Sequence, residues 1–173
     1  MSDMRHWKRG LVSGILFLAV ALVLVMWVSG PYEDGQDAYV SGDYAMALRL
    51  LLPLAEQGHV DAQNLLGIMY REGHGVPQDH VEVIKWCRLA AEQGEAIAQY
   101  NLGVMYHEGQ GVPQDYVQAH MWYSLAASRL PPGENRDKTV NNRNAVAALM
   151  TPAQVAEAQR LAGECKPRGE QAE

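Results

Sequence analysis

The chain has 173 residues, enough for one domain and a short appendage. Only Asp3, Arg5, Lys8 and Arg9 carry charge before residue 30, so the remainder holds 11 Lys and Arg against 19 Asp and Glu, a net charge of −8. An acidic domain lacks the basic patch that nucleic-acid binding requires, so we exclude nucleic acid as a partner.

The N-terminal segment is strongly apolar. Leu11 to Val28 contains no charged residue, and as a helix it would be ~27 Å long, close to the ~30 Å hydrocarbon core of a bilayer. Three basic residues precede it, which predicts a cytoplasmic N-terminus at 1–10, a transmembrane anchor at 11–29 and export of the rest. The alternative is a cleaved signal peptide, whose apolar region is usually shorter and which would release a secreted protein.

From about residue 32 the sequence repeats with a period of 36 residues. Between 62 and 91, 18 of 30 positions are identical to those 36 residues further on, including the five residues 75–79. Such a period is typical of a helical unit that buries its apolar face against a copy of itself. The pattern predicts an all-α fold, an α-solenoid of helix–turn–helix repeats, with a short first repeat at 32–60 and full repeats at 61–96 and 97–130.

Each full repeat predicts two helices joined by a glycine-rich loop. Gly67 and Gly103 recur inside the first helix, where we expect them to allow close approach of the second helix. Asp79 and Asp115 precede the second helices as N-caps, and Glu82 and Gln118 three residues later predict capping boxes. In the short first repeat, the first helix should begin near residue 31.

Two further helices are predicted within 135–164, after a break at 130–133. Thr151, Pro152 and Gln154 read as N-cap, first helical residue and capping-box partner of the last helix. We expect these helices to cover the exposed face of the last repeat, and the tail 165–173 to be flexible.

The repeated pattern, Ala-x-x-x-Leu-Gly-x-Met-Tyr-x-x-Gly-x-Gly-Val-x-x-Asp followed by tryptophan and Ala-Ala, resembles the Sel1-like repeat family, which is related to the tetratricopeptide repeat. The resemblance implies a right-handed superhelix that scaffolds protein complexes, with the first helix of each repeat lining the concave surface. It places six residues in a protein-binding groove: Asn64, Ile68, Arg71, Tyr100, Val104 and His107. The alternative is that these positions are merely solvated and free to differ. If they form a groove, replacing Tyr100 or Arg71 should weaken partner binding without loss of stability.

The sequence contains no recognisable catalytic or metal-binding motif. His107-Glu108 starts a zinc-protease pattern, but Gly111 stands where the second histidine is needed. Cys87 occupies a position held by leucine or tyrosine in the other repeats, which indicates a core residue, and a bridge between Cys87 and Cys165 stays open. We expect no metal, no cofactor and no enzymatic activity.

The sequence thus favours a membrane-anchored scaffold that presents an acidic solenoid groove to a protein or peptide partner outside the cytoplasm. The resemblance implies a bacterial protein, single-pass in the inner membrane through 11–29, with its repeats in the periplasm. One alternative is an envelope enzyme acting on cell-wall material. The other is a secreted soluble binding protein, if the N-terminal segment is cleaved.

Overall fold

The computed structural model describes residues 30–165, and this part of the chain is all helical, as predicted. The predicted transmembrane anchor at 11–29, the N-terminus at 1–10 and the tail beyond residue 165 lie outside the described residues. Within 30–165 no helix has the length and apolar character needed to cross a bilayer. The helices are α2 (Pro31–Ser41), α3 (Tyr44–Glu56), α4 (Val60–Glu72), α5 (His80–Glu92), α6 (Ala96–Glu108), α7 (Tyr116–Arg129), α8 (Glu134–Ala147) and α9 (Pro152–Glu164).

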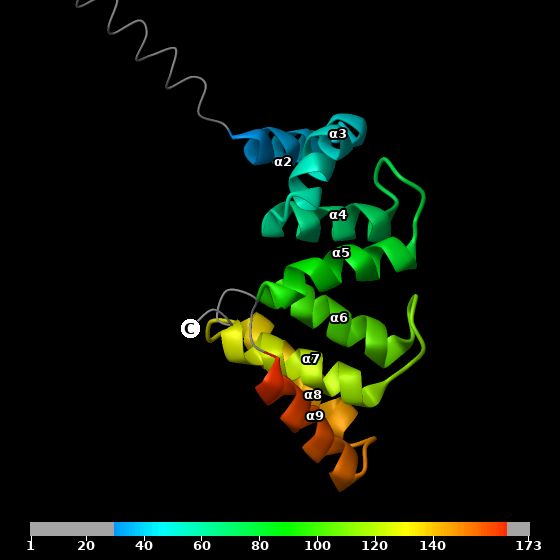
Figure 1. The fold of residues 1–173 in the computed structure, drawn as a ribbon, viewed down its shortest axis with the longest axis vertical. Coiled ribbons are helices and arrows are strands. Elements are labelled where there is room, and N and C mark those ends of the chain that lie inside the picture. Colours follow the sequence, from blue (N-terminus) through cyan, green and yellow to red (C-terminus); the bar gives the residue numbers. More distant parts are fainter. Residues whose placement is uncertain (1–29, 166–173) are drawn as a thin grey trace, which may run out of the picture.

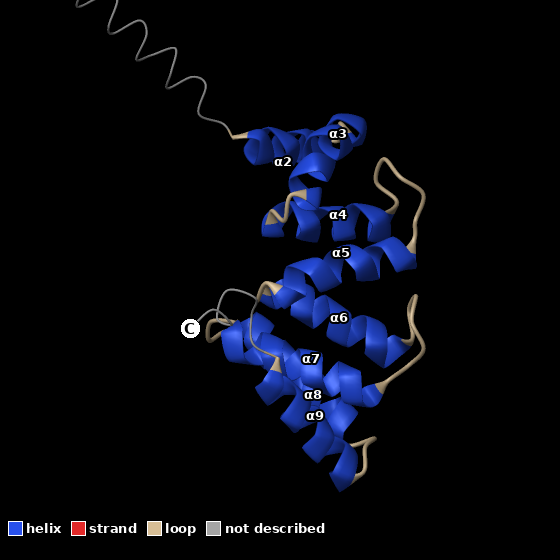
Figure 2. Ribbon diagram, viewed as in Figure 1, coloured by secondary structure: helices blue, strands red, loops and turns tan. Residues whose placement is uncertain are grey.

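The helices stack in chain order as a solenoid (Figure 1). Helices α2 and α3, α4 and α5, and α6 and α7 form successive pairs, and the second helix of each pair packs on the first helix of the next. Figure 2 shows longer loops inside the second and third pairs than between α2 and α3. The predicted short first repeat therefore has a tight turn at Gly42, and its first helix begins at Pro31 as expected.

Three glycines set the distance between the two helices of each pair. A Cβ added at Gly103 would lie 2.5 Å from Cδ1 of Tyr123, and one added at Gly67 would lie 3.0 Å from Sγ of Cys87. In the first repeat, a Cβ added at Gly35 of α2 would lie 2.8 Å from Cδ2 of Leu51 on α3. The predicted close approach is confirmed at Gly67 and Gly103, and it extends to the first repeat.

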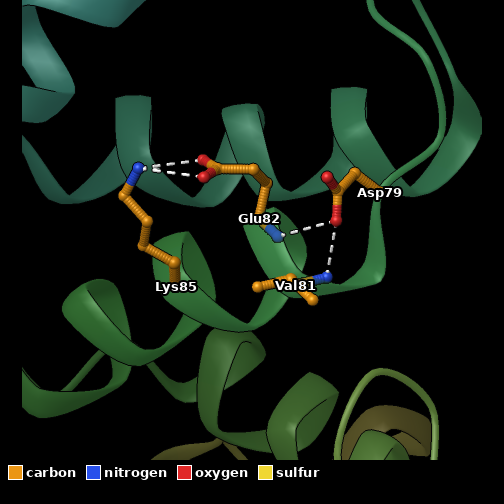
Figure 3. Close-up of polar contacts among 4 residues, drawn as sticks. All are labelled: Asp79, Val81, Glu82 and Lys85. Atoms are coloured by element: carbon orange, nitrogen blue, oxygen red, sulfur yellow. Dashed lines mark hydrogen bonds and ion pairs between the residues drawn. The ribbon is translucent and has the colours of Figure 1, made fainter.

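Asp79 and Asp115 cap α5 and α7 as predicted. The carboxylate of Asp79 accepts hydrogen bonds from the backbone N–H groups two and three residues on, at 2.8 and 3.3 Å (Figure 3). Asp115 accepts one from the N–H group three residues on, at 3.0 Å. These bonds satisfy amide groups that the first turn of a helix leaves without intrahelical partners.

The capping boxes predicted at these two helices are wrong. A capping box needs the free N–H of the N-cap residue, but Asp79 donates its N–H to the carbonyl of Tyr70 at 3.1 Å, and Asp115 makes the same bond one repeat later. Glu82 instead binds Lys85, whose Nζ lies 2.9 and 3.1 Å from its two carboxylate oxygens (Figure 3). The box predicted at α9 is present between Thr151 and Gln154.

Buried glutamines link the repeats in a way that the sequence did not reveal. Gln63, at the start of α4, donates to the carbonyl of Ala55 at 2.9 Å, and Gln99 makes the equivalent bond to Ala91 at 3.0 Å. The Oε1 atom of Gln63 accepts a hydrogen bond from Gln93 at 2.9 Å, and that of Gln99 accepts one from Arg129 at 3.3 Å. Each of the two amide oxygens is thus satisfied from the C-terminal end of the following helix. Buried amide groups are stable only with such partners, which explains why the Ala-Gln pair recurs.

The solenoid ends on α7, which both α8 and α9 contact. Both helices predicted within 135–164 therefore pack against the last helix of the third repeat. Helix α9 brings Leu161, Ala162 and Cys165 against the core cluster formed by α5, α6 and α7. Because α8 and α9 both pack on α7, they do not form a fourth helix pair of the stack within residues 30–165.

Candidate protein-binding groove

The first helices of the second and third repeats, α4 and α6, enclose a groove of about 220 Å³ together with α8. Its apolar surface comes from Ile68 of α4, Ile97 of α6 and Leu130 after α7, and its polar groups come from all three of α4, α6 and α8. We call this set the α4–α6–α8 groove. The lining residues are Ile68, Arg71, Ile97, Tyr100, Asn101, Leu130, Asn135, Lys138 and Thr139.

Three of the six predicted site residues line this groove: Ile68, Arg71 and Tyr100. Val104 lines a second hollow of about 40 Å³, which shares Arg71 and Asn101 with the groove. The structure thus brings four predicted residues to one continuous surface that runs over α4 and α6.

Asn64 and His107 line neither hollow. The Oδ1 atom of Asn64 is buried, and within residues 30–165 it has no hydrogen-bond partner. The ring of His107 lies against Tyr116, with 6.0 Å between the ring centroids, so it belongs to the contact between α6 and the start of α7.

Tyr100 has a packing role as well as a place in the groove. It packs against the cluster of Ala119, Tyr123 and Val146, and its ring centroid is 5.8 Å from that of Tyr123. Its hydroxyl accepts a hydrogen bond from Nδ2 of Asn142 on α8 at 3.3 Å. The expectation that Tyr100 can be removed without loss of stability is therefore wrong, because its ring joins α6, α7 and α8.

The groove is not acidic, although the domain around it is. Its two charged lining residues are Arg71 and Lys138, both cationic. Lys138 holds its Nζ 5.6 Å from the centroid of the Tyr100 ring, and Arg71 donates from Nε to Glu72 at 2.8 Å. The prediction of an acidic groove is therefore wrong, because the carboxylates that dominate the composition lie elsewhere on the surface.

The sequence missed six of the lining residues, for two reasons. Ile97 and Asn101 lie on α6 at positions where the repeats differ, since 36 residues earlier the chain has Asp61 and Leu65. That difference was a usable signal. Leu130 is the last residue of the predicted third repeat and the α8 residues lie beyond it, so no periodicity pointed to them.

Acidic, histidine and cysteine side chains do not gather at this surface. In the described part of the chain no group of three or more could hold a metal ion. Cys87 is buried, which raises the pKa of its thiol to about 12, and it is unpaired, as is Cys165.

Comparisons with known proteins agree with the repeat pattern. A family model described as Sel1 repeat matches three consecutive segments, residues 26–59, 60–95 and 96–129. A search of curated proteins finds no match.

Two solved structures share the fold. A protective antigen of uropathogenic Escherichia coli with an SLR fold is 29% identical over 86% of this chain, with a TM-score of 0.65. A Sel1 repeat protein from Oxalobacter formigenes is 30% identical over 76% of this chain, with a TM-score of 0.59. The chain spans only 29% and 54% of these two proteins.

Proposed function

This chain belongs to the Sel1 repeat family, and on that premise we propose that it is a scaffold whose α4–α6–α8 groove holds a segment of a partner protein. Sel1 repeat proteins generally mediate protein–protein interactions and are typically not catalysts. The observation that carries the proposal is the groove itself, which joins three structural elements and combines apolar walls with two cationic side chains.

The chemistry of the groove favours an acidic segment with an apolar side chain. Ile68, Ile97 and Leu130 offer apolar contact, while Arg71 and Lys138 offer positive charge at the same surface. Complementary charge of this kind speeds association and selects among partners more than it raises affinity. An amide at Asn101 and another at Asn135 supply hydrogen bonds that would orient a bound backbone.

Site-specific photo-crosslinking of the full-length chain in its native membrane tests this function. A photoreactive residue at Asn101, inside the groove, should give a defined protein adduct, whereas one at Val81, which is exposed on α5, should not. Lys138→Glu should weaken the adduct at least tenfold. Arg136→Glu is the matched control, because it makes the same charge change on an exposed residue of α8 outside the groove.

Equal adducts from Asn101 and Val81, or an adduct at Asn101 that Lys138→Glu leaves unchanged, would show that the groove does not bind the partner. Circular dichroism of the Lys138→Glu chain shows whether the variant is folded, so that a lost adduct can be attributed to the groove and not to unfolding. Tyr100→Ala is unsuitable as the primary variant because Tyr100 also packs between helices.

We further propose that residues 11–29 anchor the chain in the bacterial inner membrane, with the repeats in the periplasm. The support is the uncharged segment Leu11 to Val28 behind three basic residues, together with α2 beginning at Pro31, directly after it. Retention in the membrane pellet after alkaline carbonate extraction, with the full mass of the chain intact, is the expected result. A mature protein that starts near residue 30 would establish the secreted alternative instead.

A further inference from the structure

A second hollow, of about 590 Å³, lies away from the groove, between the second helices of the first two repeats. It is formed by the C-terminal end of α3, the start of α4 and one side of α5, and we call it the α3–α5 cleft. The lining residues are Ala55, Glu56, Gln57, Gly58, Gln63, Lys85, Trp86, Leu89 and Gln93.

The same surface occurs again one repeat later. Each of the nine lining residues has a counterpart 36 residues on, and seven of the nine are identical, among them Trp86 with Trp122 and Leu89 with Leu125. Only Lys85 and Gln93 differ. The two surfaces are therefore built from nearly the same side chains on equivalent helices.

In the later repeat the chain's own last helix packs on this side. Helix α9 contacts α7, and its Leu161 and Ala162 pack against the cluster that contains Met121, Trp122 and Leu125 of α7. Cys165, just after α9, packs against the same cluster. The second surface thus accepts a helix that presents a leucine followed by small side chains.

Residues 30–165 supply one such helix for two such surfaces. Within residues 30–165, α3 packs on α2 and α4, and α5 packs on α4 and α6. No further helix packs on either of them as α9 does on α7, so the α3–α5 cleft keeps its hollow. Leu89 is half-buried there, and Lys85 extends over the Trp86 ring with its Nζ 4.7 Å from the centroid. The lysine replaces Met121 of the later repeat, so the open cleft has its positive charge beside the tryptophan, whereas the covered surface has Arg129 at the position of Gln93.

We propose that the α3–α5 cleft is a second docking site, which takes an amphipathic helix of a partner protein with the contact face of α9: a leucine followed by a small residue. This site is independent of the α4–α6–α8 groove, since the two share no lining residue. Apolar contact with Leu89, which is half-buried beside the largely buried Trp86, supplies the binding, as the equivalent Leu125 does for α9.

A synthetic peptide of residues 151–165 is the probe, because it carries the contact face of α9. It is titrated to millimolar concentration into the full-length chain labelled with ¹⁵N, and the indole N–H signals are followed after assignment with Trp86→Phe and Trp122→Phe. We expect the Trp86 signal to shift and the Trp122 signal to stay. A peptide with Leu161→Glu should lose at least tenfold in affinity.

Two variants of the chain locate the binding. Leu89→Glu should abolish the shift of the Trp86 signal, whereas Val81→Glu, the same kind of change on an exposed residue of α5, should not. If Leu89→Glu fails to fold, Gln57→Trp fills the cleft from an exposed position and should weaken binding at least tenfold.

Three results overturn the proposal. A shift of the Trp122 signal alone shows that the peptide replaces α9 at its own site. Absence of any shift, or a Trp86 shift that neither cleft variant changes, shows that the cleft does not bind a helix. If the Trp86 signal shifts as the concentration of the chain is raised in the absence of peptide, the cleft binds a second copy of the chain and not a different partner.

Discussion

Replacement of Gly103 by alanine tests how closely the helices of a repeat approach one another. Alanine favours a helix over glycine by about 1 kcal/mol, so in an exposed helix this change would stabilise the chain. Here the new methyl group would lie 2.5 to 3.0 Å from three ring atoms of Tyr123, whose side chain is fully buried. Forcing an extra methyl group into a packed core costs about 1–3 kcal/mol, and so tight a contact against an immobile ring belongs at the upper end. We therefore expect a net loss of about 2 kcal/mol in the free energy of unfolding.

Gly67→Ala is the internal control, because it makes the same change in the preceding repeat. The nearest atom to the added methyl group would be Sγ of Cys87 at 3.0 Å and the next two would be at 3.9 Å, so a small shift relieves the contact. The gain in helix propensity then offsets the packing cost, and we expect a change near zero.

Urea unfolding of the full-length chain, followed by the fluorescence of the buried tryptophans, measures both changes. Combining Gly103→Ala with Tyr123→Cys recreates the arrangement of the preceding repeat, so the two changes should show a favourable coupling of about 2 kcal/mol in a double-mutant cycle. If Gly103→Ala matches or exceeds the stability of the original chain, or if Gly67→Ala costs as much, the close-approach explanation is wrong.

Three further outcomes are expected. Trp86→Ala should lower the free energy of unfolding by about 3–5 kcal/mol in urea titrations, since it removes a large side chain that is 3% exposed from the core of the first two repeats. Burial, aided by Arg143, lowers the pKa of His120 below its ordinary 6.5, so the unfolded chain binds a proton at this side chain more readily than the folded chain does. The free energy of unfolding should therefore be highest above pH 6.5, fall as the pH drops, and level off below the folded-state pKa. His120→Gln should flatten that slope when stability is measured against pH. In the folded chain iodoacetamide should modify Cys165 but not Cys87, because burial raises the pKa of the Cys87 thiol to about 12. After urea treatment, mass spectrometry should show both cysteines modified.

Repeat-level features were readable from the sequence because they depend on local periodicity. The 36-residue period implied paired helices, and aspartate before an apolar helix implied the caps at Asp79 and Asp115. The capping boxes failed because the N–H group they needed is taken by the carbonyl of Tyr70 or its equivalent across the loop, a contact outside the local pattern.

The groove could be predicted only in part. Ile68, Arg71 and Tyr100 follow from the face of the first helix, but the wall supplied by Lys138 comes from α8, which lies outside the repeats. The charge of the groove was misjudged for the same reason. Net composition describes the whole surface, whereas the sign of one groove depends on which few side chains the packing brings there.

The repeat period was sufficient to show that this chain forms stacked helix pairs, because identical residues at a fixed period must occupy equivalent sites in successive copies. Which surfaces those pairs leave open depends instead on long-range packing. It placed α9 over the surface around Trp122 and left the nearly identical surface around Trp86 uncovered. That difference arises from where the chain turns back on itself at its end, and a periodic pattern carries no information about such a long-range contact.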